Sequence, residues 1–226
     1  MQTKQEIQNT TSLIISFTDS YSQYKQGKQN EQQESESTLS LAQVTSSLES
    51  LLTQIHYTNA IKQVSQIPKL LQSLIALVTF RLGTHIKEQT YMLRLKVRRK
   101  SRLCLQQIHS CDNKQIQLEL VNQGYGRVTS ITFSTAGGIG EEQDDEIWEG
   151  LNFIARFLYA LHQGRTWQPS FKPLPLLARV SLEQIEEEGA IEEIDAQMNN
   201  NGYDGFIKLW ANEAKAATLN RFVNRR

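Results

Sequence analysis

The feature that most limits how this chain can fold is a fixed order of helical segments that occurs twice. The first occurrence has a short segment that ends at Gly124, a short apolar segment 128–133, an acidic loop 141–146 and a long amphipathic segment 147–162. The second has a helix that ends at Gly189, a short segment 191–194, an Asn/Gly loop 199–202 and a long helix 206–222. Recurrence at a period of tens of residues is typical of stacked-repeat architectures.

Helical periodicity also precedes the first occurrence. Three further helices are predicted, over residues 41–55, 67–82 and 85–110, and the second of these is apolar most of the way around, so we expect it to be the most buried. The prolines within 163–175 indicate a loop insertion between repeats. We therefore expect an all-α fold over residues 41–226: a right-handed α-solenoid of about three three-helix repeats.

Residues 1–40 are rich in Gln, Ser, Thr, Asn and Glu. This composition predicts a disordered N-terminal arm, with a short helix within 11–24 as the one ordered segment. The chain opens on polar residues and contains no apolar run long enough to span a membrane. Its two cysteines, Cys104 and Cys111, have neither zinc-site nor disulfide-framework spacing. These features predict an intracellular protein, cytoplasmic or nuclear, with reduced thiols.

Three passages resemble armadillo-repeat proteins, and more loosely the importin-alpha branch. The segment 67–74, with Pro68 before spaced leucines, resembles the consensus of the second repeat helix, and Gly124 resembles the tight turn between the first and second helices. The segment 146–155 resembles the third helix, which in the importin-alpha branch carries a Trp and, four residues later, an Asn that line a concave groove. The resemblance implies an armadillo-type fold and an extended peptide segment of another protein as the ligand.

Trp148 and Asn152 have the spacing of that pair, which places them on one helical face. The resemblance implies that Asn152 hydrogen-bonds the ligand backbone, that Trp148 packs against a Lys or Arg stem, and that Phe153 and Arg156 adjoin them. The alternative is that Trp148 fills a helix interface and Asn152 is an ordinary surface residue. The pair does not recur in the last long helix, where Ala214 stands four residues after Trp210.

The densest basic run lies in the third predicted helix, and its arginines are Arg94, Arg98, Arg99 and Arg102. They predict either a solvated helix face or contact with an acidic partner or a phosphate. The formal net charge of zero argues against general nucleic-acid binding.

Catalytic and metal-site patterns are missing from the sequence. The four histidines are scattered, without metalloprotease spacing and without a nearby nucleophile. The glycines of 137–140 are not followed by the Lys-Ser/Thr of a phosphate loop. We therefore expect a protein–protein interaction scaffold or adaptor that is not an enzyme and uses no cofactor or metal. The alternatives are a homo-oligomeric assembly protein that pairs through the apolar helix 70–80, an enzyme or nucleotide binder on an unrelated helical fold, and contact of residues 94–102 with RNA or acidic lipid.

Overall fold

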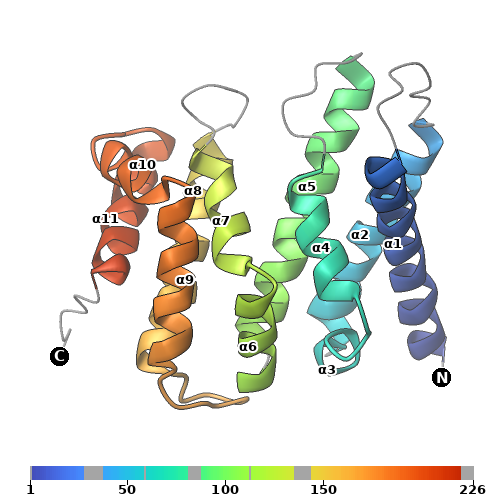
Figure 1. The fold of residues 1–226 in the computed structure, drawn as a ribbon, viewed down its shortest axis with the longest axis horizontal. Coiled ribbons are helices and arrows are strands. Elements are labelled where there is room, and N and C mark those ends of the chain that lie inside the picture. Colours follow the sequence, from blue (N-terminus) through green and yellow to red (C-terminus); the bar gives the residue numbers. More distant parts are fainter. Residues whose placement is uncertain are drawn as a thin grey trace. The chain divides into compact units, whose positions relative to one another are not determined.

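A computed structural model describes residues 2–27, 38–58, 60–80, 88–111, 113–134 and 144–219 (Figure 1). These residues are helical apart from turns, loops and one isolated β-bridge, so the prediction of an all-α fold is confirmed. The chain forms two compact units, Met1–Asp112 and Asn113–Arg226. Residues 28–37 of the predicted N-terminal arm, the glycines of 137–140 and residues 141–143 of the predicted acidic loop lie outside the described residues.

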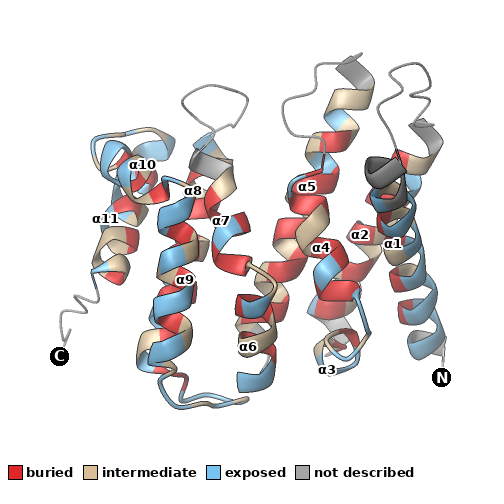
Figure 2. Ribbon diagram, viewed as in Figure 1, coloured by how far each residue is buried: buried red, intermediate tan, exposed pale blue. Residues whose placement is uncertain are grey.

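Unit 1 contains the first five helices. They are α1 (Gln2–Gly27), α2 (Thr38–Thr58), α3 (Ile61–Val64), α4 (Leu70–Val78) and α5 (Glu88–Cys111). The long helix α5 packs against both α2 and α4. Their facing sides carry the buried apolar residues, drawn red in Figure 2: Leu41, Val44, Leu48, Leu51, Ile55, Leu70, Leu74, Leu77, Val97, Leu105 and Ile108. The apolar residues that recur with helical spacing in the sequence are therefore the residues that form the core of unit 1.

The N-terminal segment differs from its prediction as a disordered arm. Residues 2–27 form one helix, α1, which packs against α2 and α4 in unit 1. Its inward stripe alternates apolar residues with threonines, Ile7, Thr11, Ile14 and Thr18, and each threonine hydroxyl donates to a carbonyl one turn earlier. Because these intrahelical bonds satisfy the hydroxyls, Thr can occupy buried positions that composition alone assigns to solvent.

One aromatic cluster joins α1 to the end of α4. The Phe80 ring lies 5.5 Å from the ring centroid of Phe17 and 4.7 Å from that of Tyr21, the second pair edge-to-face. Phe80 is fully buried. The predicted division at residue 40 therefore does not match the structure, because α1 belongs to the core of unit 1.

Unit 2 contains two successive helix triplets. The first is α6 (Lys114–Asn122), α7 (Tyr125–Ser134) and α8 (Asp144–Gln163). The second is α9 (Pro175–Glu187), α10 (Ala190–Gln197) and, after the 3-10 turn η1 (Tyr203–Gly205), α11 (Phe206–Thr218). The apolar side of α8 forms a core with α9, α10 and α11. In the first triplet the helices are short, short and long, as the sequence predicts, with 9, 10 and 20 residues. In the second triplet α9 and α11 have 13 residues each and α10 has 8.

A residue in the left-handed conformation precedes the second helix of each triplet. Gly124 and Gly189 have φ of 83° and 68°, directly before α7 and α10. In unit 1, Lys69 has φ of 64° directly before α4. Glycine adopts this conformation without the steric cost that a Cβ brings. The prediction of a tight turn at Gly124 is confirmed, and Lys69 is the corresponding non-glycine case.

The connection between α8 and α9 is an ordered loop over residues 164–174. Arg165 and Phe171 exchange two backbone hydrogen bonds, of 2.8 and 3.0 Å. The buried Arg165 side chain also donates from Nε to the Pro169 carbonyl, and its guanidinium lies over the Phe171 ring. The structure thus has a non-helical segment where the prolines predict an insertion, and the loop presents Trp167, which is 64% exposed.

Among the described residues, each helix is either too short or too polar to cross a lipid bilayer.

Candidate partner-binding surface

The helix that carries most of the predicted site residues is α8. Its first turn holds Asp144, Asp145 and Glu146, whose negative charge favours the positive end of the helix dipole. Its apolar residues recur every three or four positions and are buried in the core of unit 2: Ile147, Leu151, Ile154, Leu158 and Leu161. Burial of this stripe fixes the rotation of α8, so the other side of the helix is directed away from the core.

Trp148 lies at the edge between these two sides and is half-buried. Its ring packs against Tyr203 of η1, with a centroid distance of 5.6 Å and an interplanar angle of 30°. The indole N–H is buried, and no acceptor for it is present among the described residues. The aromatic packing predicted as the alternative role of Trp148 is therefore present, and it leaves one polar atom unsatisfied.

Two more contacts extend this aromatic contact along α11. Tyr203 lies 6.1 Å from the Phe206 ring, and the exposed Arg156 of α8 places its guanidinium 5.7 Å from the centroid of Trp210. Phe206 and Trp210 are one helical turn apart and so lie on one side of α11. We use the term aromatic surface for the residues Trp148, Arg156, Tyr203, Phe206, Leu209 and Trp210.

The aromatic surface is open to solvent in the described structure. Tyr203, Phe206 and Leu209 are 46%, 46% and 49% exposed. Meanwhile α11 buries Ile207, Ala211, Ala214 and Ala217 against α8, and the small alanines let the two helices approach closely. Helix α11 thus carries a second apolar side that its own unit does not cover.

The other two predicted site residues differ in position. Asn152 shares the side of Trp148 but is only 7% exposed, so little of it reaches solvent. Phe153 is half-buried and lies five residues after Trp148, about 140° around the helix, on a different side. The structure therefore places Trp148 against Tyr203 and Arg156 against Trp210, buries Asn152, and puts Phe153 on a different side of α8.

Sequence reasoning missed Tyr203, Phe206 and Leu209. A signal for the last two is present, because Phe206, Leu209 and Trp210 have i, i+3, i+4 spacing beside the buried stripe that begins at Ile207. Two apolar stripes on one short helix indicate one buried and one exposed apolar side. No such signal marks Tyr203, whose position depends on the geometry of η1.

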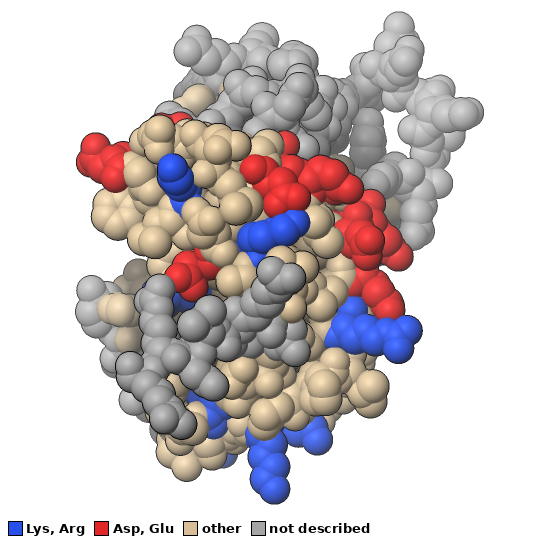
Figure 3. Space-filling model, turned by 90° about the vertical axis from the view of Figure 1, so that its left-hand side faces the viewer, with Lys and Arg blue, Asp and Glu red and all other residues tan. Residues whose placement is uncertain are grey.

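Two ion pairs join charged side chains of α9, α10 and α11. Figure 3 looks onto the side of unit 2 that carries α10 and α11, and shows carboxylates gathered on one part of the described surface with Lys and Arg beside them. Lys215 lies 2.7 Å from Asp195, and Arg179 lies 3.0 Å from Glu183. These exposed pairs stabilise the fold only weakly.

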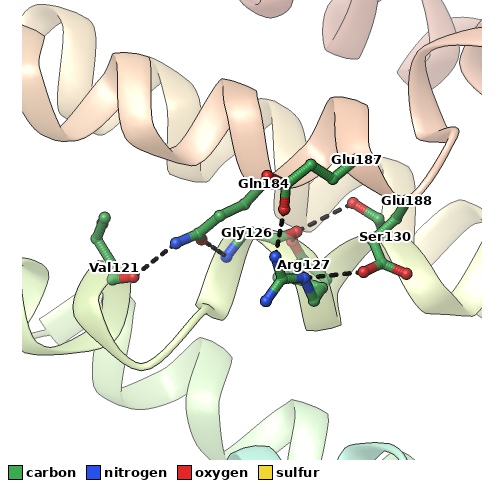
Figure 4. A network of polar contacts seen from close by, with 8 residues as sticks. Val121, Gly126, Arg127, Ser130, Gln184, Glu187 and Glu188 are labelled. Atoms are coloured by element: carbon green, nitrogen blue, oxygen red, sulfur yellow. Dashed lines mark hydrogen bonds and ion pairs between the residues drawn. The ribbon is translucent and has the colours of Figure 1, made fainter.

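A polar junction connects the two triplets of unit 2 (Figure 4). The Gln184 amide of α9 donates to the Val121 carbonyl at 2.9 Å and accepts from the Gly126 N–H at 3.2 Å. Arg127 forms ion pairs with Glu187 and, at 2.9 Å, with Glu188. A Cβ at Gly126 would lie 2.9 Å from the Ser181 carbonyl oxygen, so only glycine permits this approach. The junction is a packing contact within unit 2.

The basic run of α5 is not the solvated face that the sequence suggests. Arg94 is 1% exposed, Arg98 and Arg102 are also buried, and Arg99 is half-buried. Arg98 donates from Nη1 to the Phe80 carbonyl at 3.3 Å, beyond the C-terminal end of α4. The three buried arginines therefore contribute to the interior of unit 1, and the contact of the run with an acidic partner or phosphate stays a prediction.

Burial shifts the pKa of three titratable groups among the described residues. Burial raises the pKa of the Cys104 thiol, whose Sγ lies 3.8 Å from the Leu48 carbonyl oxygen, and raises the pKa of the Tyr125 phenol. Burial lowers the pKa of His162 near the end of α8. In the described part of the chain, no three His, Cys, Asp or Glu side chains converge where they could hold a metal ion.

Comparison with protein-family models, curated proteins and solved structures finds no match to this chain.

Proposed function

We propose that this protein is an adaptor that binds a segment of another protein on the aromatic surface of α8, η1 and α11. The observation that carries the proposal is the uninterrupted series of contacts from Trp148 through Tyr203 and Phe206, with Arg156 over Trp210 on the neighbouring helix. Trp, Tyr and Arg are the residues enriched at the energetic centres of protein interfaces. An exposed apolar patch of this kind on a soluble unit is typical of an interaction site.

We also propose that the helix triplets are armadillo-type repeats stacked in a right-handed α-solenoid. Support comes from the recurring order of helices and from the left-handed residue before α4, α7 and α10. In such an arrangement α8 and α11 are third helices of successive repeats, and their adjoining outward sides form the groove. An extended segment then lies across both helices.

The alternative of self-association through the apolar helix 70–80 has less support. Leu70, Leu74, Leu77 and Phe80 are fully buried within unit 1, so α4 presents no continuous apolar side to a second copy. The exposed residues of the aromatic surface lie in unit 2.

Selection from a random peptide display library tests the binding proposal without a known partner. Peptides enriched on the intact protein are measured by fluorescence polarisation against Phe206→Ala and Arg156→Ala. Both residues are solvent-exposed, so the variants should fold. Loss of a central interface side chain should weaken binding about tenfold or more.

Trp167→Ala is the matched control, because Trp167 is an exposed aromatic residue of the same unit outside the aromatic surface. It should leave the affinity unchanged. Peptides that bind Phe206→Ala and Arg156→Ala as tightly as the intact protein would disprove the proposal.

A further inference from the structure

Tyr203 has an unusual backbone conformation for a large side chain. Tyr203, Asp204 and Gly205 follow one another with φ of 51°, 53° and 81°. Only the glycine adopts left-handed values without steric cost, since in other residues the Cβ approaches the following carbonyl oxygen. Non-glycine residues persist in this region where the surrounding structure imposes it, and they concentrate at sites that act in binding or switching.

Contacts on both sides hold this turn in place. The Asn200 side chain donates to the Gln197 side chain at 2.7 Å and accepts from the Gly202 N–H at 2.8 Å. The Gly205 N–H donates to the Asn201 carbonyl at 3.1 Å. A Cβ on Gly202 would lie 2.5 Å from a carboxylate oxygen of Asp144 at the start of α8, so the turn packs closely against that helix.

The strained turn places the Tyr203 ring over the Trp148 indole. The contact itself is imperfect, because the buried Trp148 N–H has no acceptor among the described residues. A buried donor left unpaired is unfavourable. Two unfavourable features, the left-handed backbone and the unpaired N–H, therefore occur at one contact.

We propose that Tyr203 is a displaceable cover of Trp148, which moves aside when a partner segment binds. This inference rests on the proposed function of the aromatic surface and concerns the regulation of that site. In the covered state the Tyr203 ring occupies the face of Trp148. In the uncovered state an aromatic side chain of the partner takes the place of Tyr203, and a backbone carbonyl of the partner accepts the indole N–H.

The free protein permits a test that needs no partner. The Trp148 indole N–H is buried, so it exchanges with solvent deuterium only when its surroundings open. Its exchange rate, measured by nuclear magnetic resonance, therefore reports the open fraction. The three indole signals are assigned with Trp167→Phe and Trp210→Phe variants.

Two substitutions should change the fraction of molecules in the covered state, in opposite directions. Tyr203→Ala removes the ring and should raise the exchange rate about tenfold or more, because the N–H is then uncovered. Asp204→Gly keeps the ring and relieves the backbone at φ of 53°, so it should favour the covered state and lower the rate roughly two- to fivefold. Peptides from the display selection should bind Asp204→Gly more weakly by the same roughly two- to fivefold factor.

Lys69→Gly is the matched control, since it relieves a left-handed residue in unit 1. It should leave the exchange of Trp148 unchanged. An unchanged rate in Tyr203→Ala, or an unchanged or faster rate in Asp204→Gly, would overturn the inference. Failure of the peptide selection alone would count against the proposed function and not against the cover, because the exchange experiment uses the free protein.

Discussion

The Gln184 side chain allows a quantitative prediction about the stability of unit 2. The end of α6 and the start of α7 each leave backbone groups that no intrahelical partner satisfies. Gln184 pairs with one group of each kind, the Val121 carbonyl at 2.9 Å and the Gly126 N–H at 3.2 Å. Gln184→Ala removes both hydrogen bonds at once: it leaves the N–H of the buried Gly126 unpaired, while the Val121 carbonyl keeps the hydrogen bond from the Gly124 N–H at 3.0 Å.

The expected loss follows from these two bonds. Each hydrogen bond contributes about 1 kcal/mol, so the free energy of unfolding of unit 2 should fall by about 2 kcal/mol. For a unit of this size that corresponds to a decrease in Tm of roughly 6–10 °C. Gln184→Met keeps the length of the side chain but cannot form either bond, so it should destabilise nearly as much as Gln184→Ala.

Tryptophan fluorescence during urea unfolding measures this loss in unit 2 alone. The chain has three tryptophans, and Trp148, Trp167 and Trp210 all lie between Asn113 and Arg226. Gln163→Ala, an exposed position at the end of α8, is the control for loss of a glutamine side chain. If Gln184→Ala shifts the unfolding midpoint no more than Gln163→Ala does, the reasoning about the helix ends is wrong.

Two further predictions concern buried titratable groups. Burial lowers the pKa of His162 below 6.5, so near that pH the folded state binds fewer protons than the unfolded chain. Stability should therefore decrease as the pH falls from about 7.5 to about 5.5, and His162→Gln should weaken this dependence in urea titrations at each pH; a parallel dependence in both proteins would refute it. In Cys111→Ser, where Cys104 is the remaining thiol, reaction with a chromogenic disulfide reagent should be on the order of 100-fold slower in the native protein than in denaturant. Equal rates would show that Cys104 is accessible.

The sequence predicts best those helices whose apolar residues pack into a single core. Helix α8 is such a case, because its apolar residues recur without interruption and its first turn is acidic. Helix α4 is another, since its apolar residues extend most of the way around and are buried. Both segments were predicted from spacing alone.

The features that sequence could not supply involve polar residues in buried positions and unusual backbone conformations. Helix α1 alternates Ile with Thr, and the threonine hydroxyls bond within the helix, so its composition resembles that of a solvated segment. Arg94, Arg98 and Arg102 of α5 are buried, although arginine side chains are mostly exposed in proteins. For the candidate site, spacing places Trp148 and Asn152 on one side of α8. The contact of Tyr203 with Trp148, however, depends on a left-handed backbone conformation at Tyr203, which is uncommon for a tyrosine and so is not expected from the sequence.

The position of Gln184 along the chain has a consequence for biosynthesis. Its two backbone partners lie 58 and 63 residues earlier in the sequence. On the ribosome, α6 and α7 therefore emerge well before the side chain that completes their facing ends. The first triplet of unit 2 reaches its final stability only once α9 has left the exit tunnel, and until then water must satisfy the Gly126 N–H.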